Sequence, residues 1–216
     1  MVSQQVHIYG PNFSSFVRSV RLVCEEKNIS YSTGFSVNGE EIPFKSDKHY
    51  QLHPFGKVPV LIHAGVSICE TVAICRYLDQ EFPGPELQPS DPVARAEHDQ
   101  WCSLIAGDID QAIVRKYLLE FAFPKGENGT IRADKVKAAE PGVEKALIVL
   151  SHQLADRSYI VGDSFTIADA LLVPILDYLF SHSEFKHLHE KHSSLKDYLN
   201  RVSERKSFQK GVAAAA

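Results

Sequence analysis

Two different periodicities divide the sequence, and this contrast limits the possible folds more than any other feature. Up to about residue 82, short runs with alternating apolar residues, typical of strands, are interleaved with runs of helical spacing. Beyond residue 90 the apolar spacing is helical throughout. Between the two lies Pro83–Pro89, whose three prolines and one glycine cannot continue a helix. We therefore predict an α/β domain over residues 1–84, a linker over 85–90 and an all-helical domain over 91–216.

The first half predicts a strand, a helix and a second strand in succession. Apolar residues alternate in Val6–Tyr9, recur at helical spacing in Phe16–Cys24 and alternate again in Tyr31–Val37. A helix between two such strands predicts a crossover that leaves the strands parallel. Further along, a hairpin that turns at Ala64-Gly65 and a helix over Thr71–Glu81 are expected. This order of elements predicts a thioredoxin-like domain only in combination with the motifs described below.

The second half predicts a series of helices. Ser90 or Asp91 can cap a long helix that begins at Pro92, where the missing amide hydrogen costs nothing, and extends to Tyr117. A loop is expected over Gly126–Gly129. The helix that follows ends near residue 154, and its proline at position 141 predicts a kink or a fresh start.

Thr166 and Asp169 form a capping box, in which the hydroxyl accepts from the third helical amide and the carboxylate accepts from the threonine amide. The apolar run Ala170–Phe180 behind it predicts a central buried helix, kinked at Pro174. A last amphipathic helix is expected over Leu195–Val202, and the terminal alanines are expected to fray.

The amino-acid composition limits the classes of binding partner and the cellular location that we expect. With 23 Lys+Arg against 27 Asp+Glu the net charge is -4, which argues against nucleic acid or an anionic membrane as partner. No apolar run reaches the roughly 20 residues that span a bilayer, and the first residues are not the basic start of a secretory signal, so we expect a cytoplasmic protein. Four cysteines without CxxC spacing predict reduced, structural thiols.

No metal is expected. The histidines near residue 190 lack the i, i+4 pair with a supporting carboxylate that marks a helical zinc site, so they predict a solvated face. The cluster consists of His182, His187, His189 and His192.

Four short strings, taken in order and spacing, resemble the cytosolic glutathione transferases over essentially the whole chain, and most closely the phi-like, serine-type members. They are Tyr9–Ser14, His53–Pro59, Glu70–Ile74 and Phe165–Asp169. The resemblance implies a thioredoxin-like α/β domain followed by an all-α helical bundle. It also implies glutathione as co-substrate and a homodimer. The chain differs from phi-like relatives in carrying His53 and Lys57 for the usual Asn and Gln, and Thr71 for the commoner Ser.

A transferase of this kind needs a group that favours the thiolate, because a free thiol with a pKa near 8.5 is mostly protonated at neutral pH. Taken alone, a serine before the first helix is more often a simple cap. The resemblance places the family's catalytic serine on Ser14, with Ser15 as the adjacent alternative. Its hydroxyl would donate a hydrogen bond to the glutathione sulfur beside the positive end of the helix dipole.

The resemblance also implies the glutathione contacts. Val58-Pro59 matches the family's cis proline, which exposes the valine backbone to the cysteinyl part of glutathione, although most X-Pro bonds are trans. Glu70 and Thr71, at a strand-to-helix junction, suit the γ-glutamyl ammonium and carboxylate, or form a plain cap. Lys57 and Lys45 suit the glycyl carboxylate, or are solvated surface lysines.

The second substrate is expected to be a small hydrophobic electrophile. Its pocket would be formed by the loop residues Asn12 and Phe13 and by Ile113 and Tyr117 on the long helix, although aromatic residues at helical spacing are more often core. The predicted activity is conjugation of the glutathione thiolate to this electrophile. Two alternatives remain: a glutathione-dependent isomerase or peroxidase on the same platform, and a non-catalytic transferase-like binding module.

Overall fold

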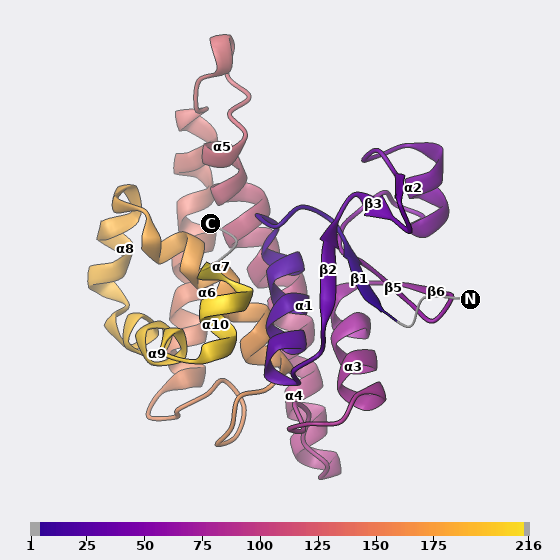
Figure 1. Ribbon diagram of the computed structural model, residues 1–216. Coiled ribbons are helices and arrows are strands. Elements are labelled where there is room, and N and C mark those ends of the chain that lie inside the picture. Colours follow the sequence, from indigo (N-terminus) through magenta and orange to yellow (C-terminus); the bar gives the residue numbers. More distant parts are fainter. Residues whose placement is uncertain (1–4, 214–216) are drawn as a thin grey trace. The chain divides into compact units, whose positions relative to one another are not determined.

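The computed structural model describes residues 5–213, leaving aside the side chain of His189, and divides the chain into two compact units (Figure 1). The first unit extends to Pro89 and resumes at Ser203, and the second contains Ser90–Val202. Of the terminal alanines that were expected to fray, those after Ala213 lie outside the described residues.

The first unit is built on a four-stranded sheet in the order β2-β1-β5-β6. β1 and β2 are parallel, as predicted, whereas β5 is antiparallel to both β1 and β6. Helix α1 packs against α3. The elements are β1 Val6–Tyr9, α1 Ser15–Glu26, β2 Tyr31–Gly34, β3 Ser36–Val37, β4 Glu40–Glu41, α2 Asp47–Leu52, β5 Val60–His63, β6 Val66–Cys69, α3 Thr71–Glu81 and α10 Lys206–Gly211.

The predicted hairpin and helix α3 are confirmed. Ala64 and Gly65 both have positive φ, 49° and 83°, as a two-residue turn between twisted strands requires. The strand predicted over Tyr31–Val37 is wrong in its second half: β2 ends at Gly34, whose φ is 131°, and β3 then pairs with β4 in a separate small sheet. Helix α2, capped by the Ser46 hydroxyl, was not predicted because it is short and polar.

The last helix, α10, was not predicted as an element. It belongs to the first unit, although the helical domain predicted over residues 91–216 includes its residues. α10 packs against α1. Arg205, just before α10, donates from Nε and Nη2 to the two carboxylate oxygens of Glu26 at 2.8 and 2.7 Å. Gly211 has no side chain where a Cβ would lie 3.3 Å from the Leu22 backbone, so the helices approach closely. The periodicity of a chain end does not reveal which unit it joins.

The second unit is helical. Its elements are α4 Pro92–Leu104, the π-helical segment η1 Ile105–Leu118, α5 Leu119–Ala122, the 3₁₀ turn η2 Glu127–Gly129, α6 Ala133–Leu154, α7 Ile167–Ser181, the 3₁₀ turn η3 Ser183–Phe185, α8 Lys186–Lys191 and α9 Ser193–Ser203. Asp91 is the cap of α4, accepting from Val93 N and Ala94 N, with Pro92 in the first turn as predicted.

Three features of this unit bear on the predictions. The capping box is confirmed, because Thr166 N donates to Asp169 Oδ2 at 2.9 Å and the Thr166 hydroxyl accepts from the third helical amide. α7 is buried along most of its length, also as predicted. In contrast, α6 runs through Pro141 without starting afresh. This proline and Lys137, whose carbonyl loses a partner, lie on the exposed face, where water can hydrate that carbonyl.

Candidate active site

One end of the four-stranded sheet gathers the segments that carry most of the predicted site residues. Tyr9 of β1 lies opposite Val60 of β5, and Val60 lies opposite Cys69 of β6. Since β5 runs antiparallel to both neighbours, the last residue of β1, the first residue of β5 and the last residue of β6 lie at the same end of the sheet. The loop with Ser14, the Val58-Pro59 step and the Glu70-Thr71 junction therefore leave the sheet at the same end.

Gly10 brings the first of these loops against the second. Its φ is 144°, which favours glycine. A Cβ at this position would lie 2.8 Å from Val17 Cγ2 and 3.0 Å from Val58 Cβ, closer than side chains tolerate. The absence of a side chain thus lets Gly10 pack closely against the side chains of Val17 in α1 and of Val58.

Ser14 is the N-cap of α1 and is half-buried, with its Oγ accepting from Val17 N at 3.4 Å. A hydroxyl that accepts one hydrogen bond can still donate its own proton. Ser15 is the first helical residue and is only 7% exposed. No acidic residue lies in the first turn of α1, so the positive end of this helix is not neutralised from within.

The loop before Ser14 is tied down at Asn12. Asn12 Oδ1 accepts from the Thr33 hydroxyl at 2.8 Å, and its backbone carbonyl accepts from Arg18 Nε at 3.3 Å. Phe13 next to it is 56% exposed. The loop therefore holds Ser14 in place while presenting an aromatic ring at the surface.

The Val58-Pro59 peptide bond is cis, as the resemblance implied. Lys57 precedes it, and Lys45 precedes α2 with a φ of 63°; both lysines are exposed. The Lys45 ammonium lies 5.6 Å from the centre of the Phe44 ring, and the Lys57 ammonium lies 5.9 Å from that of Phe55.

Glu70 occupies the N-cap position of α3 in an unusual backbone conformation. Its φ of 69° is positive, its side chain is 68% exposed, and it makes no side-chain capping bond, so the first amides of α3 receive no cap from it. Thr71 behind it is 7% exposed. An open helix start with a carboxylate beside it suits a ligand that carries both an anionic and a cationic group.

Two buried histidines near this end of the sheet have contacts that sequence reasoning did not identify. His53 Nδ1 accepts from Phe55 N at 3.1 Å, while its Nε2 lies 3.8 Å from Glu70 Oε1. Burial lowers the pKa of His53, the carboxylate of Glu70 opposes this shift, and the ammonium of Lys57 lowers the pKa further. His49 contacts the backbone at both Lys45 and Lys57. Its only signal in the sequence was its place between two candidate lysines.

Ile113 and Tyr117 lie in the second unit and are 0% and 2% exposed. The Tyr117 ring packs against Phe121 and Phe185, with ring centres 5.3 Å apart in both cases. Burial raises the pKa of Tyr117, with smaller contributions from Glu140 and Glu184. In the second unit, these two residues thus take part in an aromatic and aliphatic core.

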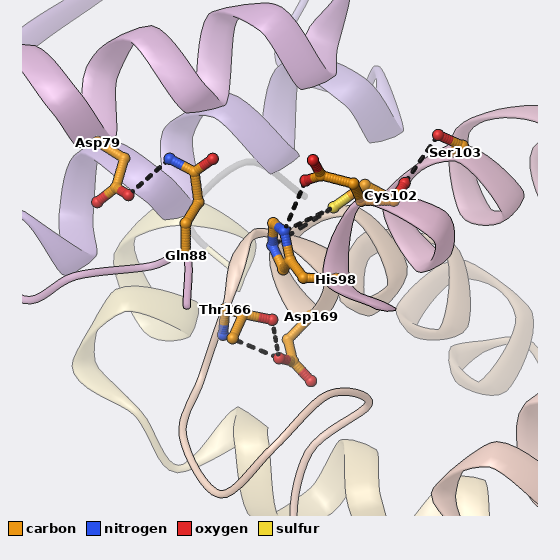
Figure 2. A network of polar contacts seen from close by, with 8 residues as sticks. Asp79, Gln88, His98, Cys102, Ser103, Thr166 and Asp169 are labelled. Atoms are coloured by element: carbon orange, nitrogen blue, oxygen red, sulfur yellow. Dashed lines mark hydrogen bonds and ion pairs between the residues drawn. The ribbon is translucent and has the colours of Figure 1, made fainter. Parts of the chain in front are cut away.

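Figure 2 shows two side-chain carboxylates that accept hydrogen bonds within their own unit. Gln88 donates to Asp79 in the first unit, and Thr166 donates to Asp169 in the second. In α4, Cys102 Sγ lies 3.5 Å from His98 Nε2, and both residues are fully buried. Figure 2 draws this contact. The four cysteines are free thiols, as predicted, and Cys24, Cys75 and Cys102 are buried.

The histidine cluster near residue 190 was predicted to form a solvated face, and this prediction is wrong for His192. His192 is only 6% exposed and lies 3.4 Å from the Ser151 hydroxyl and 3.5 Å from Glu144 Oε2, because it closes the turn between α8 and α9 against α6. His182 and His187 are exposed, and the side chain of His189 is outside the described residues. Over residues 5–213 no group of three or more His, Cys, Asp or Glu could hold a metal ion, and no helix could cross a membrane.

Comparison with known proteins finds the same family in both units. Residues 8–86 match the glutathione S-transferase N-terminal domain and residues 111–206 match the C-terminal domain. A probable glutathione S-transferase of Solanum tuberosum is 32% identical over 166 residues, which cover 76% of this chain and 69% of the relative. Glutathione S-transferase F10 of Arabidopsis thaliana is 27% identical over 209 residues, or 94% of each chain.

The fold agrees equally well. The crystal structure of glutathione transferase F2 from Populus trichocarpa superposes with a TM-score of 0.83 at 26% identity, over 97% of this chain and 98% of the other. The predicted thioredoxin-like and helical architecture is confirmed, as is the resemblance to phi-like relatives. The chain belongs to the glutathione S-transferase family.

Proposed function

We propose that this chain activates glutathione through Ser14, whose hydroxyl donates a hydrogen bond to the sulfur and keeps it as the thiolate. The observation that carries the proposal is a half-buried hydroxyl at the start of α1, at the same sheet end as an open helix start at Glu70-Thr71. Ser15 is a weaker candidate because its side chain is buried.

The energies required are modest. Lowering the thiol pKa by about two units corresponds to roughly 2.7 kcal/mol of preference for the charged form. A hydrogen bond to a charged group supplies about 1.5–3 kcal/mol, and a helix N-terminus adds about 0.3–1 kcal/mol. The free energies from one hydroxyl and one helix N-terminus are therefore large enough to account for this shift of the thiol pKa.

The remaining glutathione contacts follow from charge. Glu70 would receive the γ-glutamyl ammonium, while the first amides of α3 at Thr71 would bind its carboxylate. The Val58 backbone before Pro59 would pair with the cysteinyl residue. Lys45 and Lys57 would bind the glycyl carboxylate.

For the second substrate we propose a small hydrophobic electrophile, attacked by the thiolate. In the first unit the contacts that we propose are Asn12 and the exposed Phe13. In this assignment the α/β domain over 1–84 binds glutathione, and the helical domain that follows the 85–90 linker serves the electrophile. A cytoplasmic homodimer is the form we propose, and sedimentation at micromolar concentration checks the dimer.

Ser14→Ala tests the role of the hydroxyl. Losing one charge-assisted hydrogen bond should lower kcat/KM at neutral pH by roughly 10- to 100-fold. The pKa of bound glutathione, followed by thiolate absorbance against pH, should rise, whereas the glutathione Kd should hardly change. Equal activity at neutral pH would refute the proposal.

Two variants control for the cap. Ser14→Thr keeps both the capping oxygen and the hydroxyl, so it should retain most of the activity. Ser15→Ala makes the same chemical change one residue along and should leave the thiol pKa unaltered. If Ser15→Ala instead raises the thiol pKa and Ser14→Ala does not, the activating hydroxyl is that of Ser15.

A further inference from the structure

His49 is a fully buried imidazole whose two nitrogens both contact backbone groups outside its own helix. Nδ1 accepts from the amide of Lys45 at 2.9 Å, and Nε2 lies 3.0 Å from the carbonyl oxygen of Lys57. An amide N–H only donates and a carbonyl only accepts, so the two contacts fix the neutral ring with its proton on Nε2. One side chain thereby links the segment before α2 to the segment before β5.

The ring is held by its packing as well as by its hydrogen bonds. Its centre lies 4.8 Å from that of Tyr9 and 5.2 Å from that of Phe44. Tyr9 is itself fixed, because its hydroxyl donates to the carbonyl of Ile42 at 2.9 Å and its ring is in the core. His49 thus connects both lysine segments to the end of β1.

The two linked residues carry ammonium groups without a carboxylate partner. Over the described residues of the first unit, neither the Lys45 nor the Lys57 ammonium lies within 4.0 Å of an acidic side chain, whereas nearby Lys48 pairs with Glu40. Two cations that are exposed, unpaired and joined through one buried ring make a suitable pair for a single carboxylate. A long, flexible lysine binds more tightly when its backbone is fixed in advance.

We propose that His49 is a positioning residue that sets the spacing of Lys45 and Lys57 and so determines recognition of the glycyl carboxylate of glutathione. This inference rests on the proposed glutathione site. His49 itself touches no ligand atom in this assignment. It acts through the backbone of the two lysines, and its effect is confined to the glycyl end of the tripeptide.

The test compares glutathione with γ-glutamylcysteine, which lacks the glycine. Two variants each keep one of the two hydrogen bonds: in His49→Asn the new amide oxygen can replace Nδ1, and in His49→Gln the longer amide can replace Nε2–H. Calorimetric titration should show a glutathione Kd raised about 10-fold or more. The γ-glutamylcysteine Kd should change less than about 3-fold.

Equal weakening of both ligands would overturn the inference, because it would mean general damage to the fold. Unchanged binding of glutathione would overturn it too. Thermal unfolding identifies a variant that fails to fold, and the other variant then carries the test. His53→Asn is the matched control: it alters a second buried histidine that lies beside Glu70, so it should affect both ligands to the same extent.

The double variant Lys45→Met/Lys57→Met separates this inference from the proposed function. It should weaken glutathione and spare γ-glutamylcysteine, and if it does not, the glycyl subsite itself is misassigned. If the lysines matter but the His49 variants do not discriminate between the ligands, the positioning role alone fails. Adding His49→Asn to the double variant should change neither Kd further, whereas a merely structural histidine would still weaken the binding of both ligands.

Discussion

Two buried carboxylates, one taken from each unit, are stabilised in different ways. Asp79 in the first unit forms an ion pair with Lys27 at 2.9 Å, with side chains 7% and 2% exposed. Asp169 in the second unit is completely buried and accepts hydrogen bonds from neutral groups: Ile160 N, Tyr198 Oη, and the amide and hydroxyl of Thr166. Figure 2 shows a neutral donor to each, Gln88 to Asp79 and Thr166 to Asp169.

The difference shows what each carboxylate holds together. Asp79 also accepts from Leu87 N at 3.1 Å, and Lys27 donates to the carbonyl of Pro85, so one ion pair joins α1, α3 and the segment after α3. Asp169 joins the loop at Ile160, the start of α7 and α9. A buried ion pair depends on its partner charge, whereas a carboxylate surrounded by neutral donors depends on the number of hydrogen bonds.

Lys27→Met should have the largest effect. It leaves Asp79 buried without its cation, which costs about 3–5 kcal/mol of unfolding free energy. Urea denaturation measures it. The double variant Lys27→Met/Asp79→Leu removes both charges and should recover part of the loss. A single variant that is as stable as the wild type would show that the ion pair contributes nothing.

Asp169→Asn should cost less, about 1–3 kcal/mol, because the amide nitrogen must face groups that can only donate, such as the Thr166 amide. The same urea measurement applies. Tyr198→Phe removes one of the four donors and should cost about 1 kcal/mol. If Asp169→Asn is the more damaging of the two carboxylate-site changes, hydrogen bonds hold this unit more firmly than the ion pair holds the other.

This contrast also explains how much could be predicted from the sequence. The Thr166-Asp169 capping box and the Ala64-Gly65 hairpin depend on residues within three positions of each other, and both were predicted. The Lys27–Asp79 pair joins residues 52 positions apart, and no local pattern indicates it. The same is true of His49, whose contact at Lys57 depends on where α2 lies.

Within the candidate site, the sequence could provide residue types but not their surroundings. Ser14, Glu70 and Thr71 were named from motifs, and the sheet register brings their segments to one end. Which of Ser14 and Ser15 is buried depends on where α1 begins, a detail that periodicity resolves only within a few residues. The burial of Ile113 and Tyr117 depends on the packing of the second unit and has no signal beyond apolar spacing.

The smallest expected effect concerns pH, and the two units should respond with opposite sign. Burial lowers the pKa of His7 and His53 in the first unit below the ordinary 6.5, so the unfolded chain binds more protons below that pH. The free energy of unfolding should then fall as the pH drops from about 7.5 to 5.5. Burial raises the pKa of Asp169 above 3.8, with its hydrogen bonds opposing, so this carboxyl favours the folded state as pH falls through its folded pKa.

His53→Asn separates the two contributions. It removes one histidine while His7 remains, so its unfolding free energy, measured in urea at several pH values, should depend on pH less steeply than that of the wild type. Asp169→Asn removes the contribution of opposite sign, so its unfolding free energy should depend on pH at least as steeply as that of the wild type. Parallel curves for the wild type and His53→Asn would show that His53 protonates as readily in the folded chain as in the unfolded one, and that its burial beside Glu70 does not restrict its charge.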